Sequence, residues 1–173
     1  MVDAELVLKF QGGEESAFEA LVRKYMGDAY RFCLRLTRDA QEAEELSQMG
    51  FVSAYRALRG FRGESSFKSW LYRIFINHHR DHLRRTRRAE ARLAVVRERN
   101  HPPCPGDSTE LEEVVRRKVD LLPERQREVL MLHLYQGLDY HEIAAALGCS
   151  YDGVKMNLSL ARKRLKEELK GYR

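Results

Sequence analysis

The side chains that could do chemistry in this chain are mostly cationic, and they gather in two blocks. Residues 67–99 carry 10 basic and 3 acidic side chains, and residues 154–173 carry 7 basic and 2 acidic ones. The segments 1–66 and 100–153 are acidic by comparison, with 9 basic against 11 acidic and 5 against 10. Dense Lys and Arg attract polyanions, although such runs also occur on solvated helix faces. The pattern therefore indicates two candidate nucleic-acid-binding surfaces.

The second basic block follows a pattern that is typical of a helix-turn-helix. Asp139 and Glu142 form a capping-box pair that starts a short helix, and Gly148 suits the positive φ that ends it. Ser150 can cap a second helix, whose apolar residues must face the domain. From this second helix we expect the following residues to contact DNA: Tyr151, Asp152, Lys155, Met156, Ser159, Arg162, Lys163 and Lys166.

Three neighbouring histidines raise the alternative of an enzyme or a metal site. His78 and His82 lie one helical turn apart, next to His79, but the glutamate of a His-Glu-x-x-His zinc site is missing. No glycine-rich phosphate loop is found either. We therefore expect no enzyme activity, no metal and no cofactor. Whether His101 and Cys104 sense a metal or the redox state stays open.

Helical periodicity decides which elements position these groups. Apolar residues recur at steps of three and four along most of the chain, which predicts helices and no sheet. The helix after Asp39 has small residues on its apolar face, including Gly50 and Ala54, so a neighbouring helix could pack closely. The expected caps and first helical residues are Asp3, Asp39, Ser65 or Ser66, Asp107 and Pro123, and the expected ends are Gly12 and Gly137.

The prolines indicate where the chain divides. Three of the four lie in residues 100–107, and proline breaks a helix, so we expect a flexible linker there. The predicted fold is all-α, with small helical domains at 1–99 and 108–173. No stretch reaches the roughly 20 apolar residues of a membrane helix, and the charges in residues 1–10 do not fit a signal peptide. Three cysteines do not suit a disulfide framework, so we expect a cytoplasmic protein without membrane insertion.

On these residues the chain resembles the bacterial extracytoplasmic-function (ECF) sigma factors, the compact specificity subunits of RNA polymerase. The second half is similar to the family's region 4 in the runs LPERQREV at 122–129, GLDYHEIA at 137–144 and ARKRL at 161–165. The first half is similar to region 2 in the run FRGESSFKSWLYRI at 61–74, followed by Asn77, Asp81, Arg84 and Arg85. The resemblance implies a protein that binds core RNA polymerase and promoter DNA and directs initiation, with an anti-sigma factor as its regulator.

The resemblance also implies site residues in the first half. Residues that would hold single-stranded minus-ten DNA are Phe61, Arg62, Gly63, Ser65, Lys68, Arg73, Asn77, Arg80, Arg84 and Arg85. Beside them, Phe67, Trp70 and Tyr72 offer aromatic faces, with Trp70 mostly in the core. Residues that would contact core polymerase are Glu45, Leu46, Gln48, Met49 and Val52, with Met49 in place of the family's acid.

One alternative function of a different class remains at this point. A helix-turn-helix repressor or activator would work without core polymerase, and such proteins usually bind two half-sites as dimers. Promoter-specific transcripts made with added core polymerase would distinguish the two functions.

Overall fold

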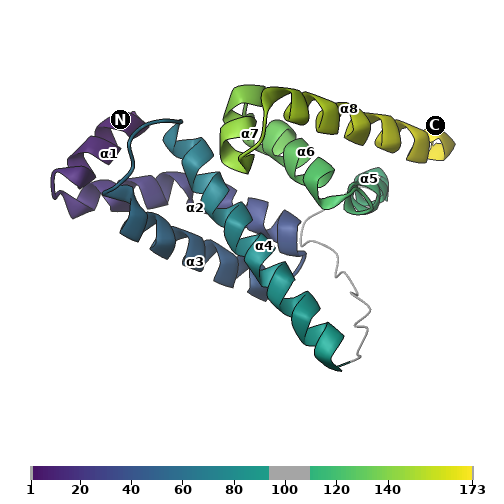
Figure 1. Ribbon diagram of the computed structural model, residues 1–173, viewed down its shortest axis with the longest axis horizontal. Coiled ribbons are helices and arrows are strands. Elements are labelled where there is room, and N and C mark those ends of the chain that lie inside the picture. Colours follow the sequence, from purple (N-terminus) through teal and green to yellow (C-terminus); the bar gives the residue numbers. More distant parts are fainter. Residues whose placement is uncertain (1, 94–109, 173) are drawn as a thin grey trace. The chain divides into compact units, whose positions relative to one another are not determined.

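The computed structural model describes residues 2–93 and 110–172, and every regular element within these ranges is helical (Figure 1). The prediction of an all-α fold with two helical domains is confirmed. The chain divides into two compact units, Met1–Pro102 and Pro103–Arg173. The predicted linker at 100–107 and the expected cap at Asp107 lie outside the described residues. In the described ranges no helix is both long enough and apolar enough to cross a bilayer.

The first unit is built around an aromatic core between helices. Its elements are α1 (Asp3–Gln11), α2 (Glu15–Thr37), α3 (Ala40–Leu58) and α4 (Phe67–Leu93). Phe32 of α2 meets Tyr72 of α4 with ring centroids 4.9 Å apart, and Tyr72 meets Phe75 at 5.9 Å. All three rings are fully buried. This packing fixes α4, which carries the first basic block, against α2.

Helices α3 and α4 approach closely where Gly50 faces Phe75. A Cβ atom at Gly50 would lie 2.2 Å from Cε1 of Phe75, well inside any van der Waals contact. The glycine is therefore a requirement of the close approach, in spite of its cost inside a helix. The expectation that small residues on this helix allow close packing is confirmed.

Local capping in the first unit follows the sequence at two of three positions. Asp39 caps α3, because its Oδ1 accepts a hydrogen bond of 2.8 Å from the backbone N–H of Glu42. At the start of α4 the backbone N–H of Ser69 donates to Oγ of Ser66 at 3.1 Å. Ser66, and not Ser65, is therefore the capping side chain.

The expected cap at Asp3 is wrong. The residue before α1 is Val2, and Asp3 is already helical. Its carboxylate instead accepts hydrogen bonds from the hydroxyl of Tyr25 and the ammonium of Lys24, each 2.5 Å long. The carboxylate that the local sequence predicts to cap α1 is used in a tertiary contact with α2.

The second unit contains the helix-turn-helix. Its elements are α5 (Glu110–Asp120), α6 (Glu124–Gln136), α7 (Tyr140–Leu147), α8 (Tyr151–Glu168) and the 3₁₀ turn η1 (Lys170–Tyr172). Asp139 and Glu142 form the predicted capping box, with hydrogen bonds of 2.8 and 3.1 Å. Gly148 has φ of 61°, and Ser150 Oγ accepts from the N–H of Gly153 at 3.1 Å. The predicted turn and both its caps are confirmed.

Helix α6 supports the end of α7 through one arginine. Arg125 donates a 2.9 Å hydrogen bond to the carbonyl of Leu147, and its guanidinium lies 3.6 Å from the buried carboxylate of Glu128. Pro123 is the residue before α6 and has an extended ψ of 142°, so its expected place as the first helical residue is wrong by one position. The hydrogen bond from Arg125 to Leu147 links α6 to the turn between α7 and α8.

Candidate nucleic-acid interface

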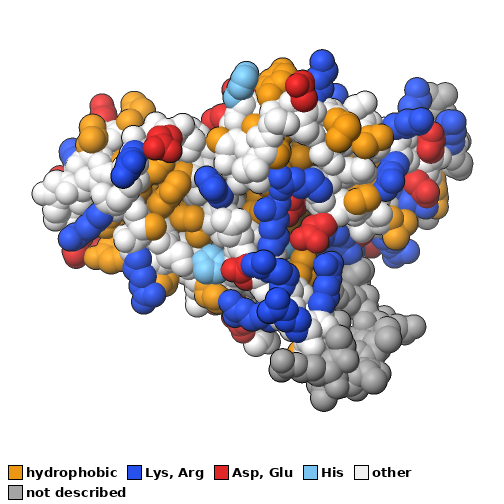
Figure 2. Space-filling model, in the orientation of Figure 1, with side chains coloured by type: hydrophobic (Ala, Val, Ile, Leu, Met, Phe, Trp, Pro, Cys, Tyr) orange, Lys and Arg blue, Asp and Glu red, His pale blue; other side chains and the backbone are white. Residues whose placement is uncertain are grey.

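Helix α8 has one buried face and one exposed face. Val154, Leu158 and Ala161 are buried, at spacings of three and four that place them on one side of the helix. The residues predicted to contact DNA are all exposed: Tyr151, Asp152, Lys155, Met156, Ser159, Arg162, Lys163 and Lys166. Figure 2 shows Lys and Arg gathered over the C-terminal part of this helix. The exposed face therefore has a mostly uncharged N-terminal half and a basic C-terminal half.

Sequence reasoning missed two side chains beside this face. Leu160 is 40% exposed, one turn after Met156, which is 59% exposed, so the two form a small apolar surface. Their i, i+4 spacing was a signal that could have found Leu160. His141 of α7 packs against Tyr151 of α8, with ring centroids 4.6 Å apart. No local pattern predicts that contact, because the two residues belong to different helices.

In the first unit, four of the predicted DNA-contacting residues form a stripe along α4. Arg73, Asn77, Arg80 and Arg84 follow at steps of four, three and four, which places them on one face of the helix. Arg73, Asn77 and Arg84 are exposed and Arg80 is half-buried. Figure 2 shows basic side chains gathered over the C-terminal half of α4. Arg85 is turned away from this stripe by about 100° of helix rotation.

The loop before α4 adds polar and aromatic groups at the N-terminal end of that helix. Phe61 is half-buried, and its ring centroid lies 5.1 Å from that of Trp70. Phe67 and Tyr72 are buried, 5% and 0% exposed, so neither is available to stack on a base, contrary to the expectation. The other predicted residues of this segment are exposed or half-buried: Arg62, Gly63, Ser65 and Lys68.

Helix α3 presents a mixed acidic and apolar face. Met49 and Val52 are 46% and 48% exposed, and Glu45 and Gln48 are exposed beside them. Leu46 was predicted in the same contact surface but is only 6% exposed.

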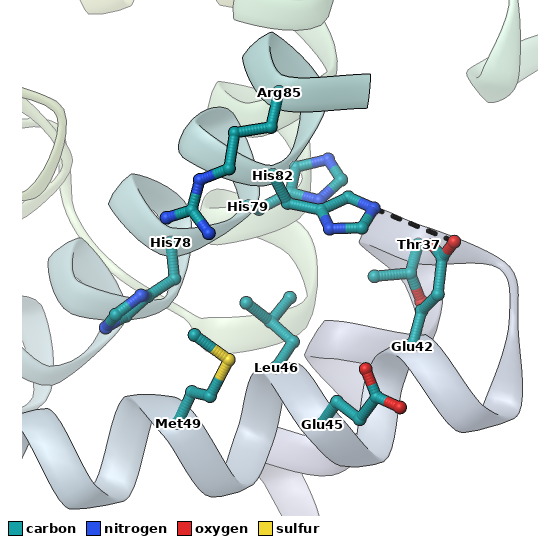
Figure 3. A pocket seen from close by; sticks show the side chains of 9 residues that line it. All are labelled: Thr37, Glu42, Glu45, Leu46, Met49, His78, His79, His82 and Arg85. Carbon is teal, nitrogen blue, oxygen red and sulfur yellow. Dashed lines mark ion pairs between the residues drawn. The ribbon is translucent and has the colours of Figure 1, made fainter. Parts of the chain in front are cut away.

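A pocket of about 210 Å³ lies between α3 and α4 (Figure 3). Its lining residues are Thr37, Glu42, Glu45, Leu46, Met49, His78, His79, His82 and Arg85. Within it the ring of His82 lies 3.7 Å from the carboxylate of Glu42. Arg85 lines this pocket, so the structure separates it from the α4 stripe with which the sequence grouped it.

The histidines do not converge on a common centre. Nε2 of His78 lies 2.8 Å from Oγ of Ser53, and Figure 3 shows the rings of His78 and His82 pointing to opposite sides of the pocket. Among residues 2–93 and 110–172, no group of three or more His, Cys, Asp or Glu side chains could hold a metal ion. His101 and Cys104 lie outside the described residues.

Comparison with known proteins connects these surfaces. Residues 21–89 match the family model of sigma-70 region 2, and residues 112–165 match that of sigma-70 region 4. The chain is 36% identical to the RNA polymerase sigma-H factor of Pseudomonas aeruginosa, over 96% of this chain and 93% of the relative. It is 31% identical to the ECF RNA polymerase sigma-E factor of Escherichia coli K12, over 95% and 93%.

Solved structures agree with the sequence comparison. The sigma factor RpoE from Bartonella quintana, solved in complex with the anti-sigma factor NepR, has a TM-score of 0.75 and 29% identity over 90% of this chain and 98% of that one. CnrH, solved in complex with the cytosolic domain of CnrY, has a TM-score of 0.73 and 27% identity over 98% and 97%. None of these relatives favours the repressor alternative. The chain belongs to the ECF sigma factors, which direct transcription initiation by RNA polymerase.

Proposed function

We propose that this sigma factor divides its work among three surfaces, one for the polymerase and two for the promoter. The observation that carries the proposal is the two-sided character of α8, since all the residues expected to contact DNA are exposed while Val154, Leu158 and Ala161 are buried. A protein that used α8 only for packing would have no need of that exposed basic side.

The stripe on α4 and the loop before it hold the opened minus-ten strand. Three arginines spaced along one helix face, Arg73, Arg80 and Arg84, can follow a phosphate backbone, and Asn77 among them can hydrogen-bond a base edge. The half-buried pair of Phe61 and Trp70 supplies an aromatic surface at the N-terminal end of the stripe. This combination of cations and aromatic rings is what single-strand binding requires.

The face on α3 binds core RNA polymerase. Exposed Met49 and Val52 form an apolar centre, and Glu45 and Gln48 supply polar groups at its edge. Interfaces between proteins commonly have this arrangement of an apolar centre with a polar rim. Because Met49 carries no charge, we expect the contact between Met49 and the polymerase to depend on burial of apolar surface.

Helix α8 reads the minus-thirty-five element in the major groove. Met156 in its N-terminal half and Leu160 one turn later can contact thymine methyl groups, and Lys155 can contact a guanine edge or a phosphate. Arg162, Lys163 and Lys166 lie farther along and meet the phosphate backbone.

We extend the proposal to regulation and location. The relative solved with the anti-sigma factor NepR suggests that a protein inhibitor also holds this chain. We place the chain in the cytoplasm with the polymerase. It contributes binding and strand separation, and the polymerase supplies the nucleotidyl transfer.

Run-off transcription with purified core polymerase tests the proposal. We expect discrete transcripts whose mapped start sites share two upstream elements. The control is a variant with Arg73 and Arg84 both changed to Ala, which should initiate poorly on duplex promoters while still binding core polymerase. Specific duplex binding without any promoter-specific transcript would contradict the proposal and would favour a repressor.

A further inference from the structure

Helix α1 contacts the loop that the proposed function assigns to the minus-ten strand. Nε2 of Gln11, the last residue of α1, donates hydrogen bonds to the carbonyl of Leu58 at 3.1 Å and to that of Phe61 at 2.7 Å. An amide nitrogen carries two hydrogens, so one side chain can satisfy both carbonyls. The two acceptors lie where α3 ends and the loop begins. Residues 3–11 precede the match to sigma-70 region 2, which starts at residue 21.

Gln11 is held in place by a well-packed helix. Phe10 is 1% exposed, and its ring centroid lies 5.5 Å from that of Phe18 and 5.3 Å from that of Tyr55. At the other end of α1, Asp3 is hydrogen-bonded to Tyr25 of α2. The donor therefore approaches the loop from a helix that is fixed at both ends.

Backbone hydrogen bonds also shape the start of this loop. The N–H of Gly60 donates to the carbonyl of Ala57 at 3.0 Å, and the N–H of Phe61 donates to that of Leu58 at 3.1 Å. Gly63 then has φ of 72°, with open space where a Cβ atom would lie. The two bonds from Gln11 add to these where the chain leaves α3, and one of them holds the carbonyl of Phe61 itself.

We propose that Gln11 is a positioning residue for minus-ten DNA. By bonding both carbonyls it fixes the loop in the conformation that receives an unstacked base, without touching the DNA itself. The proposal rests on the proposed function of the loop. It adds α1 to the parts of the chain that determine promoter opening.

The test uses holoenzyme and a forked promoter fragment taken from the run-off mapping, with 2-aminopurine in its unpaired minus-ten segment. Gln11→Met removes both donors at similar size, and we expect affinity for the fork to fall about tenfold, as for two hydrogen bonds. Gln11→Glu should lose at least as much, because a carboxylate repels the two carbonyls. Gln11→Lys keeps a donor that can reach both carbonyls, so it should restore most of the affinity.

A matched control separates this role from charge and from folding. Lys9→Gln makes the same change of net charge as Gln11→Glu, at an exposed position of the same helix, and should bind the fork normally. Core affinity and binding of a minus-thirty-five duplex should stay unchanged in all variants, and the fluorescence of Trp70 should report an intact first unit. A purely structural role would lower core affinity as well.

The outcomes distinguish the inference from the function on which it rests. Full fork affinity in Gln11→Met, or equal losses of fork and core affinity, would overturn the role of Gln11. Failure of Lys to restore binding where Met and Glu lose it would also count against hydrogen-bond donation. If Arg62→Ala in the loop and Lys68→Ala at the start of α4 leave fork binding intact as well, then the loop and the start of α4 do not hold the minus-ten strand. Both the proposed function of the loop and the inference then fail.

Discussion

The same substitution, Gly to Ala, should have opposite effects at two positions of the first unit. In a helix interior Ala is more favourable than Gly by about 1 kcal/mol. At Gly27 of α2 an added Cβ meets nothing nearer than the guanidinium of Arg31 at 3.6 Å. Gly27→Ala should therefore raise the free energy of unfolding by about 1 kcal/mol, or the melting temperature by about 5 °C.

At Gly50 the same methyl group would clash with the ring of Phe75, which is held in place by its neighbours. The added Cβ would lie 2.2 Å from Cε1 and 2.3 Å from Cδ1 of Phe75. Phe75 is fully buried, with the rings of Phe51 and Tyr72 at centroid distances of 5.5 and 5.9 Å. Overpacking of this kind costs about 3 kcal/mol at the upper end of its usual range. Less the gain in helix propensity, Gly50→Ala should lower the free energy of unfolding by about 2 kcal/mol.

Urea denaturation of the full chain, followed by tryptophan fluorescence, measures both effects. Trp70 is the one tryptophan of the sequence and lies in the first unit, so its signal reports on that unit alone. Combining Gly50→Ala with Phe75→Leu should recover part of the loss, because the smaller side chain vacates the space. If Gly50→Ala were as stable as the parent, the close approach of α3 and α4 would not require glycine, and the reasoning would be refuted.

Three further predictions concern the proposed surfaces and the core. Glu45→Lys should weaken binding to core polymerase by about tenfold in a fluorescence titration. Its free energy of unfolding should stay within about 0.5 kcal/mol of the parent, since an exposed helix charge adds little stability. Unchanged core affinity would show that the α3 face is not part of the interface. Lys163→Ala should weaken binding to all DNA duplexes alike, and it should make the slope of log K against log salt concentration shallower by about one unit. Met156→Ala should alter the sequence preference and leave this slope unchanged. If both changed only the slope, α8 would anchor the DNA without reading it. Burial raises the pKa of the Cys33 thiol from 9.0 to about 12. As the pH rises above 9, the thiol is therefore deprotonated in the unfolded state before it is in the folded state. The free energy of unfolding should fall as a result, by about 2 kcal/mol at pH 10.5. A Cys33→Ala variant that lost as much stability over the same pH range would show that other groups are responsible.

The sequence alone determined the helices and most of their ends. Periodicity of apolar residues predicts an all-α chain, and the capping box of Asp139 with Glu142 and the turn at Gly148 follow from local chemistry. The two-sided character of α8 also follows from spacing, because Val154, Leu158 and Ala161, its buried residues, lie within one arc of the helix. Such features depend on neighbours within about four residues, which a sequence displays directly.

Only the tertiary structure decided the role of a side chain where the sequence allows more than one. Asp3 bonds to α2 and does not cap its own helix, and Tyr72 has the aromatic ring that could stack on a base but lies fully buried. Arg85 belongs to the same basic block as Arg84 yet lines a pocket against α3. Gln11 reaches carbonyls about 50 residues away. Each of these outcomes depends on which helix packs against which face, and no spacing along the chain contains that information.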